Sequence, residues 1–237
     1  MPALNELKQE LEKKKNPEQA KNLQRYFKTG KGQYGEGDIF IGIRVPMIRE
    51  IAKKYIDLSF EDLQKLLDSR IHEQRLIALL ILVDKYRKNK KNNIEKMKIC
   101  RFYLENTKNI NNWDLVDLSA PNIIGDFSLH EGNDAIRQLA KSKNLWEKRI
   151  AIISTFAFIK QRNLGETLAI ANMLINDKHD LIHKAVGWAL REVGKKNREV
   201  LEIFLKARYK NMPRTMLRYA IEKFPEDLRK KYLKGEI

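Results

Sequence analysis

A segment that recurs along the chain decides the fold. Leu181–Arg191 reads LIHKAVGWALR, a polar first turn that continues into a mostly apolar helix. Three earlier segments can be laid over it: HEQRLIALLIL from His72, NNWDLVDLSAP from Asn111 and WEKRIAIISTF from Trp146. The corresponding positions are Arg75, Asp114, Arg149 and Lys184, at steps of 39, 35 and 35 residues. A period of this size indicates an array of stacked helical units.

The rest of the chain has the same helical character. Apolar residues recur at spacings of three and four, strand signals are nearly absent, and Pro17, Pro46 and Pro225 stand where helices should begin. We expect helices near residues 3–14, 17–28, 46–56, 59–68, 72–88, 91–106, 112–125, 132–142, 145–161, 164–175, 179–195, 197–208, 213–224 and 226–234. The connections are short except for Thr29–Gly42, which holds five of the eleven glycines.

These patterns predict an all-α fold, a curved α-solenoid of HEAT-like helical repeats that forms a single domain over residues 1–237. In such a stack each unit buries its apolar face against its neighbours. An ordinary globular helical bundle is the alternative.

Charge defines the class of partner. Lys and Arg outnumber Asp and Glu by 47 to 31, which gives a formal charge of +16, and residues 181–237 carry half of it. Such an excess attracts polyanions, although a soluble charge-rich protein would share this composition. The apolar runs Leu76–Val83 and Ile150–Ile159 are too short for a membrane span, and the charged N-terminus lacks the apolar stretch of a signal peptide. With Cys100 as the one cysteine, we expect a cytoplasmic protein without an internal disulfide.

The aligned positions suggest how a phosphate backbone, such as that of DNA, would be held. If they line one face of the stack, they form a row of basic groups, interrupted at Asp114 and, one turn on, at Asp117. Trp113 and Asp117 are four residues apart and share a helix face, as do Lys184 and Trp188. An indole beside a carboxylate favours a flat, cationic ligand, although a single tryptophan is more often part of a core.

Two other motifs give weaker evidence of function. The glycine-rich string from Gly30 lacks the ending of a phosphate-binding loop and a preceding strand, so we expect a flexible loop that lines the DNA. His179 and His183 are four apart without a third ligand nearby, so we expect a surface pair and no metal site.

The chain resembles the bacterial AlkD-like DNA alkylation repair glycosylases over nearly its whole length. The resemblance is carried by Asn16-Pro17-Glu18…Arg25-Tyr26, GIRVP at Gly42–Pro46, WDLVD at Trp113–Asp117, Gly125-Asp126, WEKR at Trp146–Arg149 and KAVGWALRE at Lys184–Glu192. The WDLVD and KAVGWALRE segments together are the specific part. The departure is the loop KTGKGQYGEGDIF, which is longer than in the best-known member.

The resemblance implies roles for particular residues. Asp117 matches the catalytic carboxylate, Trp113 and Trp188 match tryptophans around the lesion-bearing nucleotide, and Arg149 matches an arginine near the catalytic site. The expected DNA-binding residues are Tyr26, Arg44, Arg49, Lys184 and Arg191. No metal or cofactor is expected, and the lesion need not be flipped into a pocket.

The resulting hypothesis is a DNA glycosylase that excises cationic 3-methyladenine and 7-methylguanine from alkylated double-stranded DNA, acting as a monomer without contact to membranes. Alkylation at these nitrogens already makes the base a good leaving group, which leaves the enzyme to stabilise an oxocarbenium-like sugar and to position water. One alternative is a non-catalytic HEAT-like protein that binds damaged or branched DNA. Another is a scaffold whose basic face meets acidic proteins.

Overall fold

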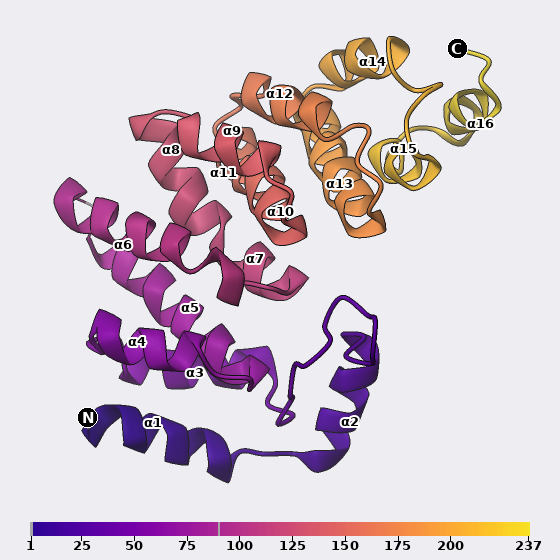
Figure 1. Cartoon of the computed structure of the whole chain (residues 1–237). Coiled ribbons are helices and arrows are strands. Elements are labelled where there is room, and N and C mark those ends of the chain that lie inside the picture. Colours follow the sequence, from indigo (N-terminus) through magenta and orange to yellow (C-terminus); the bar gives the residue numbers. More distant parts are fainter. Residues whose placement is uncertain (1, 90) are drawn as a thin grey trace. The chain divides into compact units, whose positions relative to one another are not determined.

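The computed structural model describes residues 2–89 and 91–237, and within them the protein is helical throughout (Figure 1). Those residues contain no extended strand, and their only β-pairing is an isolated parallel bridge between Ile39 and Ile71. The predicted all-α class is confirmed. The chain forms two compact units, the first ending at Ser119 and the second running from Ala120 to Ile237.

The first unit is organised around its longest helix, α5. Its helices are α1 (Pro2–Lys13), α2 (Pro17–Tyr26), α3 (Val45–Lys54), α4 (Phe60–Leu67), α5 (His72–Lys88), α6 (Asn93–Glu105) and α7 (Trp113–Ser119), with a 3₁₀ turn at Thr107–Asn109. Helix α5 packs against α3, α4, α6 and α7, and its residues from His72 to Val83 are all buried. A helix that is apolar nearly all round must lie inside, so α5 is the core of this unit.

The second unit is organised around α10 and α13. It begins with a π-helical turn (Pro121–Gly125) and continues through α8 (Asp126–Glu131), α9 (Asp134–Lys141), α10 (Leu145–Ser154), α11 (Phe156–Lys160), α12 (Gly165–Met173), α13 (Asp180–Lys196), α14 (Arg198–Lys206), α15 (Arg214–Ala220) and α16 (Glu226–Lys234). Helix α10 packs against α9 and α13, and α13 packs against α12, α14 and α15. Neighbouring helices thus share buried faces along this unit.

Most helices begin and end close to the predicted residues because their start signals are local. Asn16, Ser59, Asn92 and Asn197 each accept a backbone N–H of the first turn that they precede, as N-cap residues do. The predicted helix over 145–161 is divided at Thr155 into α10 and α11. The predicted helix over 112–125 ends at Ser119 and gives way to the π turn, and α8 was not predicted.

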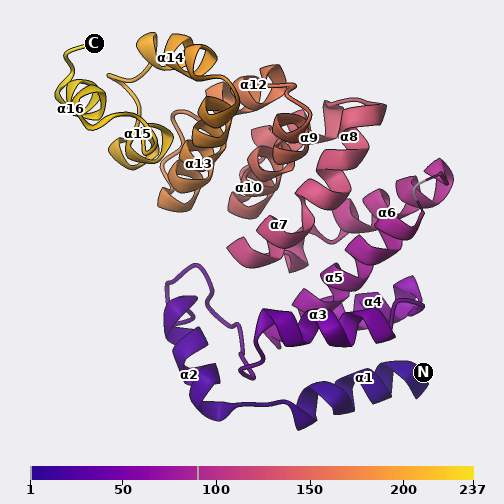
Figure 2. The same ribbon diagram turned by 180° about the vertical axis from the view of Figure 1, so that it is seen from behind.

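The long connection between α2 and α3 is the exception to the short loops (Figure 2). We predicted a flexible loop for the glycine-rich string Gly30–Gly37, and the stretch that follows it, Phe40–Ile43, is buried and hydrogen-bonded. Buried Glu73 accepts the backbone N–H groups of Ile41, Gly42 and Ile43 at 3.1, 2.8 and 3.3 Å. The backbone N–H of Asn16 donates to the carbonyl of Ile41 at 2.9 Å. One carboxylate of α5 therefore fixes the end of the loop.

Gly42 allows this packing. Its φ is +86°, and a Cβ placed there would lie 2.1 Å from the carbonyl oxygen of Asn16. A side chain at this position would meet both backbone strain and a backbone clash.

We expect Gly42→Ala to lower the free energy of unfolding by more than about 2 kcal/mol, because the strain of a positive φ adds to the displacement of Asn16. Gly32→Ala is the matched control: Gly32 has φ +75° with nothing within 4 Å of its Cβ position, so it should lose about 1 kcal/mol from backbone strain alone. Urea unfolding of both variants measures the difference. Equal losses would show that the contact with Asn16 contributes nothing.

Candidate functional site

Three of the four aligned positions of the repeat, Arg75, Asp114 and Arg149, are buried, so they do not form the predicted exposed basic row. The guanidinium of Arg75 is buried, pairs with Asp38 at 2.6 Å and donates to the carbonyl of Ser69 at 2.8 Å. Arg149 is 5% exposed and donates to the carbonyl of Leu181 at 3.0 Å. Lys184 pairs with Asp180 of its own helix at 2.7 Å. Arg75 and Arg149 therefore serve contacts within the protein, whereas Lys184 keeps a side chain that is 41% exposed.

Asp114 belongs to a buried charge network centred on His72, the first residue of α5. His72 is 1% exposed, with Nε2 2.8 Å from Asp114 Oδ2 and Nδ1 3.1 Å from Asp38 Oδ2. Asp38 also accepts from Arg75 at 2.6 Å and from the side-chain amide of Asn112 at 3.2 Å. Two carboxylates thus face one imidazole and one guanidinium, and the four charges balance when His72 is protonated.

The surroundings of His72 keep its proton in place. Burial by itself would lower the pKa of His72, but the charge of Asp114 and the hydrogen bonds to Asp114 and Asp38 raise it to about 9. Burial opposes the ionised form of Asp38 as well, yet His72 and Arg75 hold the pKa of that carboxyl below its usual range. Both pKa shifts favour the charged forms of Asp38 and His72 at neutral pH.

Trp113 is the first residue of α7, directly before Asp114 in the same unit. Its indole stacks on the ring of Phe27 with centroids 4.9 Å apart and planes at 7°, and Tyr26 meets it edge-on at 5.9 Å. Trp113 is half-buried, whereas Tyr26 is 65% exposed. The structure therefore places the predicted Tyr26 and Trp113 together, with aromatic surface left for a ligand.

The two carboxylates of the WDLVD segment differ in their environments. Asp114 is 7% exposed and is paired with His72, while Asp117 is half-buried on α7, one turn after Trp113. Asp117 also contributes to raising the pKa of Tyr103, the largest cause being burial of that phenol. Of these two, Asp117 is thus the carboxylate with a partly exposed side chain. From the sequence we predicted Asp117 alone as catalytic, on the resemblance, and placed Asp114 in the aligned row without a partner.

In the second unit, Trp188 lies on α13, four residues after Lys184. It is half-buried and packs edge-on against Phe156 with centroids 4.6 Å apart. Gly187 just before it allows α13 to approach α15, because a Cβ there would lie 2.5 Å from the Cβ of Tyr219. Trp188 is therefore held on a closely packed helix while part of its ring stays exposed.

The predicted phosphate-binding arginines are of two kinds. Arg44 and Arg49, at the start of α3 and within it, have exposed side chains. Arg191 is half-buried and forms ion pairs with Glu222 and Glu192. A phosphate at Arg191 would have to compete with two carboxylates, so the exposed pair is better suited to that role.

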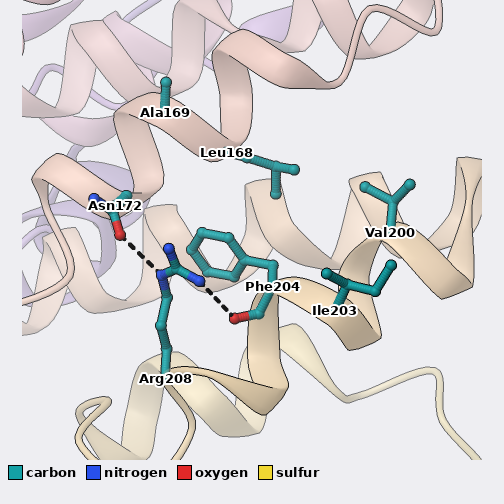
Figure 3. Close-up of a pocket in the computed structure, with 7 residues that line it drawn as sticks. All are labelled: Leu168, Ala169, Asn172, Val200, Ile203, Phe204 and Arg208. Atoms are coloured by element: carbon teal, nitrogen blue, oxygen red, sulfur yellow. Dashed lines mark hydrogen bonds between the residues drawn. The ribbon is translucent and has the colours of Figure 1, made fainter.

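Each unit has a cavity, and of these two only the cavity of the first unit is lined by a predicted site residue, Arg44. One of about 270 Å³ in the first unit is lined by Phe27, Phe40, Arg44, His72, Asp114 and seven further residues. The other, about 460 Å³ in the second unit, lies between α12 and α14 against Phe204, whose ring is covered by Arg208 at 4.4 Å (Figure 3). No predicted site residue lines this second cavity.

Within residues 2–89 and 91–237, no group of three or more His, Cys, Asp or Glu side chains is arranged to hold a metal ion. His179 caps α13 by accepting the N–H of Leu181 at 3.1 Å, and a ring nitrogen of His183 lies within hydrogen-bonding distance of the carbonyl of Asp177. In the same part of the chain, no helix is long and apolar enough to cross a membrane.

The raised pKa of His72 predicts a pH-dependent stability. Its contribution should be complete below pH 6.5, decline as the pH rises toward about 9 and be absent above that. The decline corresponds to about 3 kcal/mol. Urea unfolding of wild type and His72→Gln across pH 6 to 10 measures it as the difference between the two curves. Parallel curves would show that His72 is neutral in the folded protein.

Comparisons with known proteins agree with this architecture. A predicted DNA alkylation repair enzyme from Enterococcus faecalis superposes with a TM-score of 0.68 at 18% identity, covering 90% of this chain and 98% of that one. AlkD2 from Streptococcus mutans superposes with a TM-score of 0.57 at 19% identity, covering 93% and 99%. These likenesses identify the fold as an all-α solenoid of repeats. No curated protein sequence matches significantly. The family model described as DNA alkylation repair enzyme matches residues 7–224, and the chain belongs to that family.

Proposed function

We propose that this protein is a DNA glycosylase that hydrolyses the N-glycosidic bond of cationic alkylated bases, 3-methyladenine and 7-methylguanine, in double-stranded DNA. Membership of the DNA alkylation repair enzyme family supports a repair role on DNA. The excess of positive charge, +16, suits a polyanionic substrate. The specific reaction rests on the residues of α7.

The observation that carries the proposal is the difference in exposure between Asp114 and Asp117. Asp114 is buried and already balances the charge of His72. Asp117 follows Trp113 by one turn of α7, and its side chain is partly exposed. A carboxylate next to an indole can stabilise a positive centre that develops on a bound sugar. We therefore assign the catalytic role to Asp117.

The reaction needs little activation of its leaving group. When the bond between C1′ and the base nitrogen breaks, its electron pair stays with the base and cancels the positive charge that alkylation introduced. The sugar becomes oxocarbenium-like, and Asp117 stabilises it electrostatically. Water then forms the new C1′–O bond and passes a proton to the carboxylate or to solvent. Atoms and charge balance without a redox partner.

Aromatic side chains supply the surface for the damaged nucleotide. Tyr26 and Trp113 meet edge-on in the first unit, and Trp188 presents part of its ring in the second. Flat apolar faces of this kind pack on sugars and bases and attract cationic rings. Trp113 and Trp188 are each proposed to contact the lesion-bearing nucleotide.

The basic residues are proposed to hold the phosphates. Arg44 and Arg49 are exposed, Lys184 is partly exposed, and Arg191 would exchange its carboxylate partners for phosphate. Arg149 is proposed to support the site from its buried position at α10, since its guanidinium already holds the start of α13. The protein is proposed to act as a monomer in the cytoplasm, without a cofactor.

Single-turnover release of methylated bases from N-methylated duplex DNA tests the proposal. We expect wild type to release 3-methyladenine and 7-methylguanine, and Asp117→Asn to be slower by about 100-fold or more because it loses the negative charge beside the sugar. Asp57→Asn is the matched control, because Asp57 has a 90% exposed side chain with one distant ion-pair partner, Lys88. It changes the net charge equally and should keep the rate.

Two outcomes would contradict this account. A wild-type protein that binds duplex DNA with a steep salt dependence but releases no base would be a non-catalytic DNA-binding protein. An Asp117→Asn variant as active as wild type would leave the glycosylase in place and remove Asp117 from the mechanism.

A further inference from the structure

A cluster of packed rings joins His72 to Trp113 within the first unit, and Phe27 touches both of them, with its centroid 5.3 Å from that of His72. The imidazole of His72 stacks on Phe40 with centroids 4.3 Å apart and planes at 21°. Phe40 stacks on Phe27 at 4.8 Å and 26°, and Phe27 stacks on Trp113 at 4.9 Å and 7°. Phe27 and Phe40 are buried, with Leu23 and Trp113 packed against them. The orientation of the Trp113 ring is therefore set by the rings beneath it.

His72 is also connected to Trp113 through the neighbouring carboxylate. Asp114 accepts from His72 with Oδ2 and from the backbone N–H of Leu115 with Oδ1 at 2.9 Å. Asn112 accepts the backbone N–H of Trp113 at 2.8 Å and donates to Asp38, the other partner of His72. Both residues that flank Trp113 thus belong to the network around one imidazole.

This arrangement requires an imidazole that donates from both nitrogens. Carboxylate oxygens accept hydrogen bonds, and a neutral imidazole has one N–H to give. The charged groups around His72 are Asp38 from the loop, Glu73 and Arg75 from α5, and Asp114 from α7, while Phe40 stacks on its ring and Phe27 packs against it at a tilt. Loss of the proton would leave one carboxylate facing a lone pair in a buried site.

Helix α7 depends on such outside contacts because it is short. It has seven residues, and a helix of that length is not stable by itself. Its first turn is held by Asn112 and Asp114, and its last residue, Ser119, lies 2.9 Å from the hydroxyl of buried Tyr103. Asp117 lies between these two attachments.

We propose that His72 is a positioning residue that sets the Trp113 indole, through the packed rings of Phe40 and Phe27, and the first turn of α7, through Asp114, so that Trp113 and Asp117 are aligned for reaction. The part concerning catalysis rests on the proposed glycosylase function. His72 itself is buried and does not contact the DNA.

Fluorine NMR tests the positioning directly. With 5-fluorotryptophan incorporated, the three tryptophans give three ¹⁹F resonances, each assigned by a Trp→Phe variant. We expect His72→Gln to shift or broaden the Trp113 resonance while the Trp146 and Trp188 resonances stay in place. Glu166→Gln is the matched control: Glu166 is a buried carboxylate that accepts from Arg137 and Asn133 in the second unit. It should leave the Trp113 resonance unchanged.

A titration of wild type covers the case in which His72→Gln does not fold. Raising the pH removes the proton from His72 without any substitution, so the Trp113 resonance should move with a midpoint near pH 9. The Trp146 and Trp188 resonances serve as internal references. A Trp113 resonance that moves in neither experiment overturns the proposal.

The excision assay tests the catalytic part. In folded His72→Gln we expect the single-turnover rate to fall between about 10-fold and 100-fold, as for a misplaced reacting group, with duplex affinity within about twofold of wild type. An unchanged rate would overturn the claim that positioning matters for catalysis. If wild type releases no base, the proposed function fails, and the fluorine experiments alone decide whether His72 positions Trp113.

Discussion

The structure of the first unit depends on one buried histidine held between two carboxylates. His72 binds Asp38, which lies 34 residues before it, and Asp114, which lies 42 residues after it. Removing several charges from water is costly, and the cost is offset only while each charge keeps its partner. The long loop, α5 and α7 must therefore take up their places together, and the loss of any one member leaves an unpaired charge in the core.

The structure also separates buried structural residues from the partly exposed ones that are proposed to act on DNA. Asp114, Arg75 and Arg149 have buried side chains with partners inside the protein, and they hold helices together. Tyr26, Trp113 and Asp117 stand beside this framework with part of their surfaces exposed. A rigid first turn of α7 below a partly exposed indole and carboxylate is the kind of support that a preorganised catalytic site requires.

Local sequence was sufficient for most of the fold. Helix α5 and helix α16 begin and end at the predicted residues, because apolar spacing and start signals are local properties. The break of α10 at Thr155 and the π turn after Ala120 were not predictable from spacing, because they depend on packing against neighbours. The burial of Phe40–Ile43 at the end of the long loop was not predicted either.

The four aligned positions do not form the exposed basic row that the repeat alignment predicted. Arg75, Asp114 and Arg149 are buried, whereas the side chain of Lys184 is 41% exposed. Two signals for the pairing of His72 and Arg75 with Asp38 were present in the sequence. His72 and Arg75 begin a helix that is otherwise almost wholly apolar, so their charges needed buried partners. Asp38 directly precedes the apolar run Ile39–Ile43, which made it a candidate for such a partner. The partners are distant in sequence, so only the folded chain identifies them. The separation of Asp114 from Asp117 follows from that pairing.

The central claim is that a doubly protonated His72 ties the loop to α7, and nitrogen NMR of the ¹⁵N-histidine-labelled protein at pH 7.5 tests it most directly. The account predicts that both ring nitrogens of His72 carry a proton, each with a slowly exchanging N–H signal that a His72→Gln sample lacks. A His72 ring with one protonated and one bare nitrogen at that pH would contradict it.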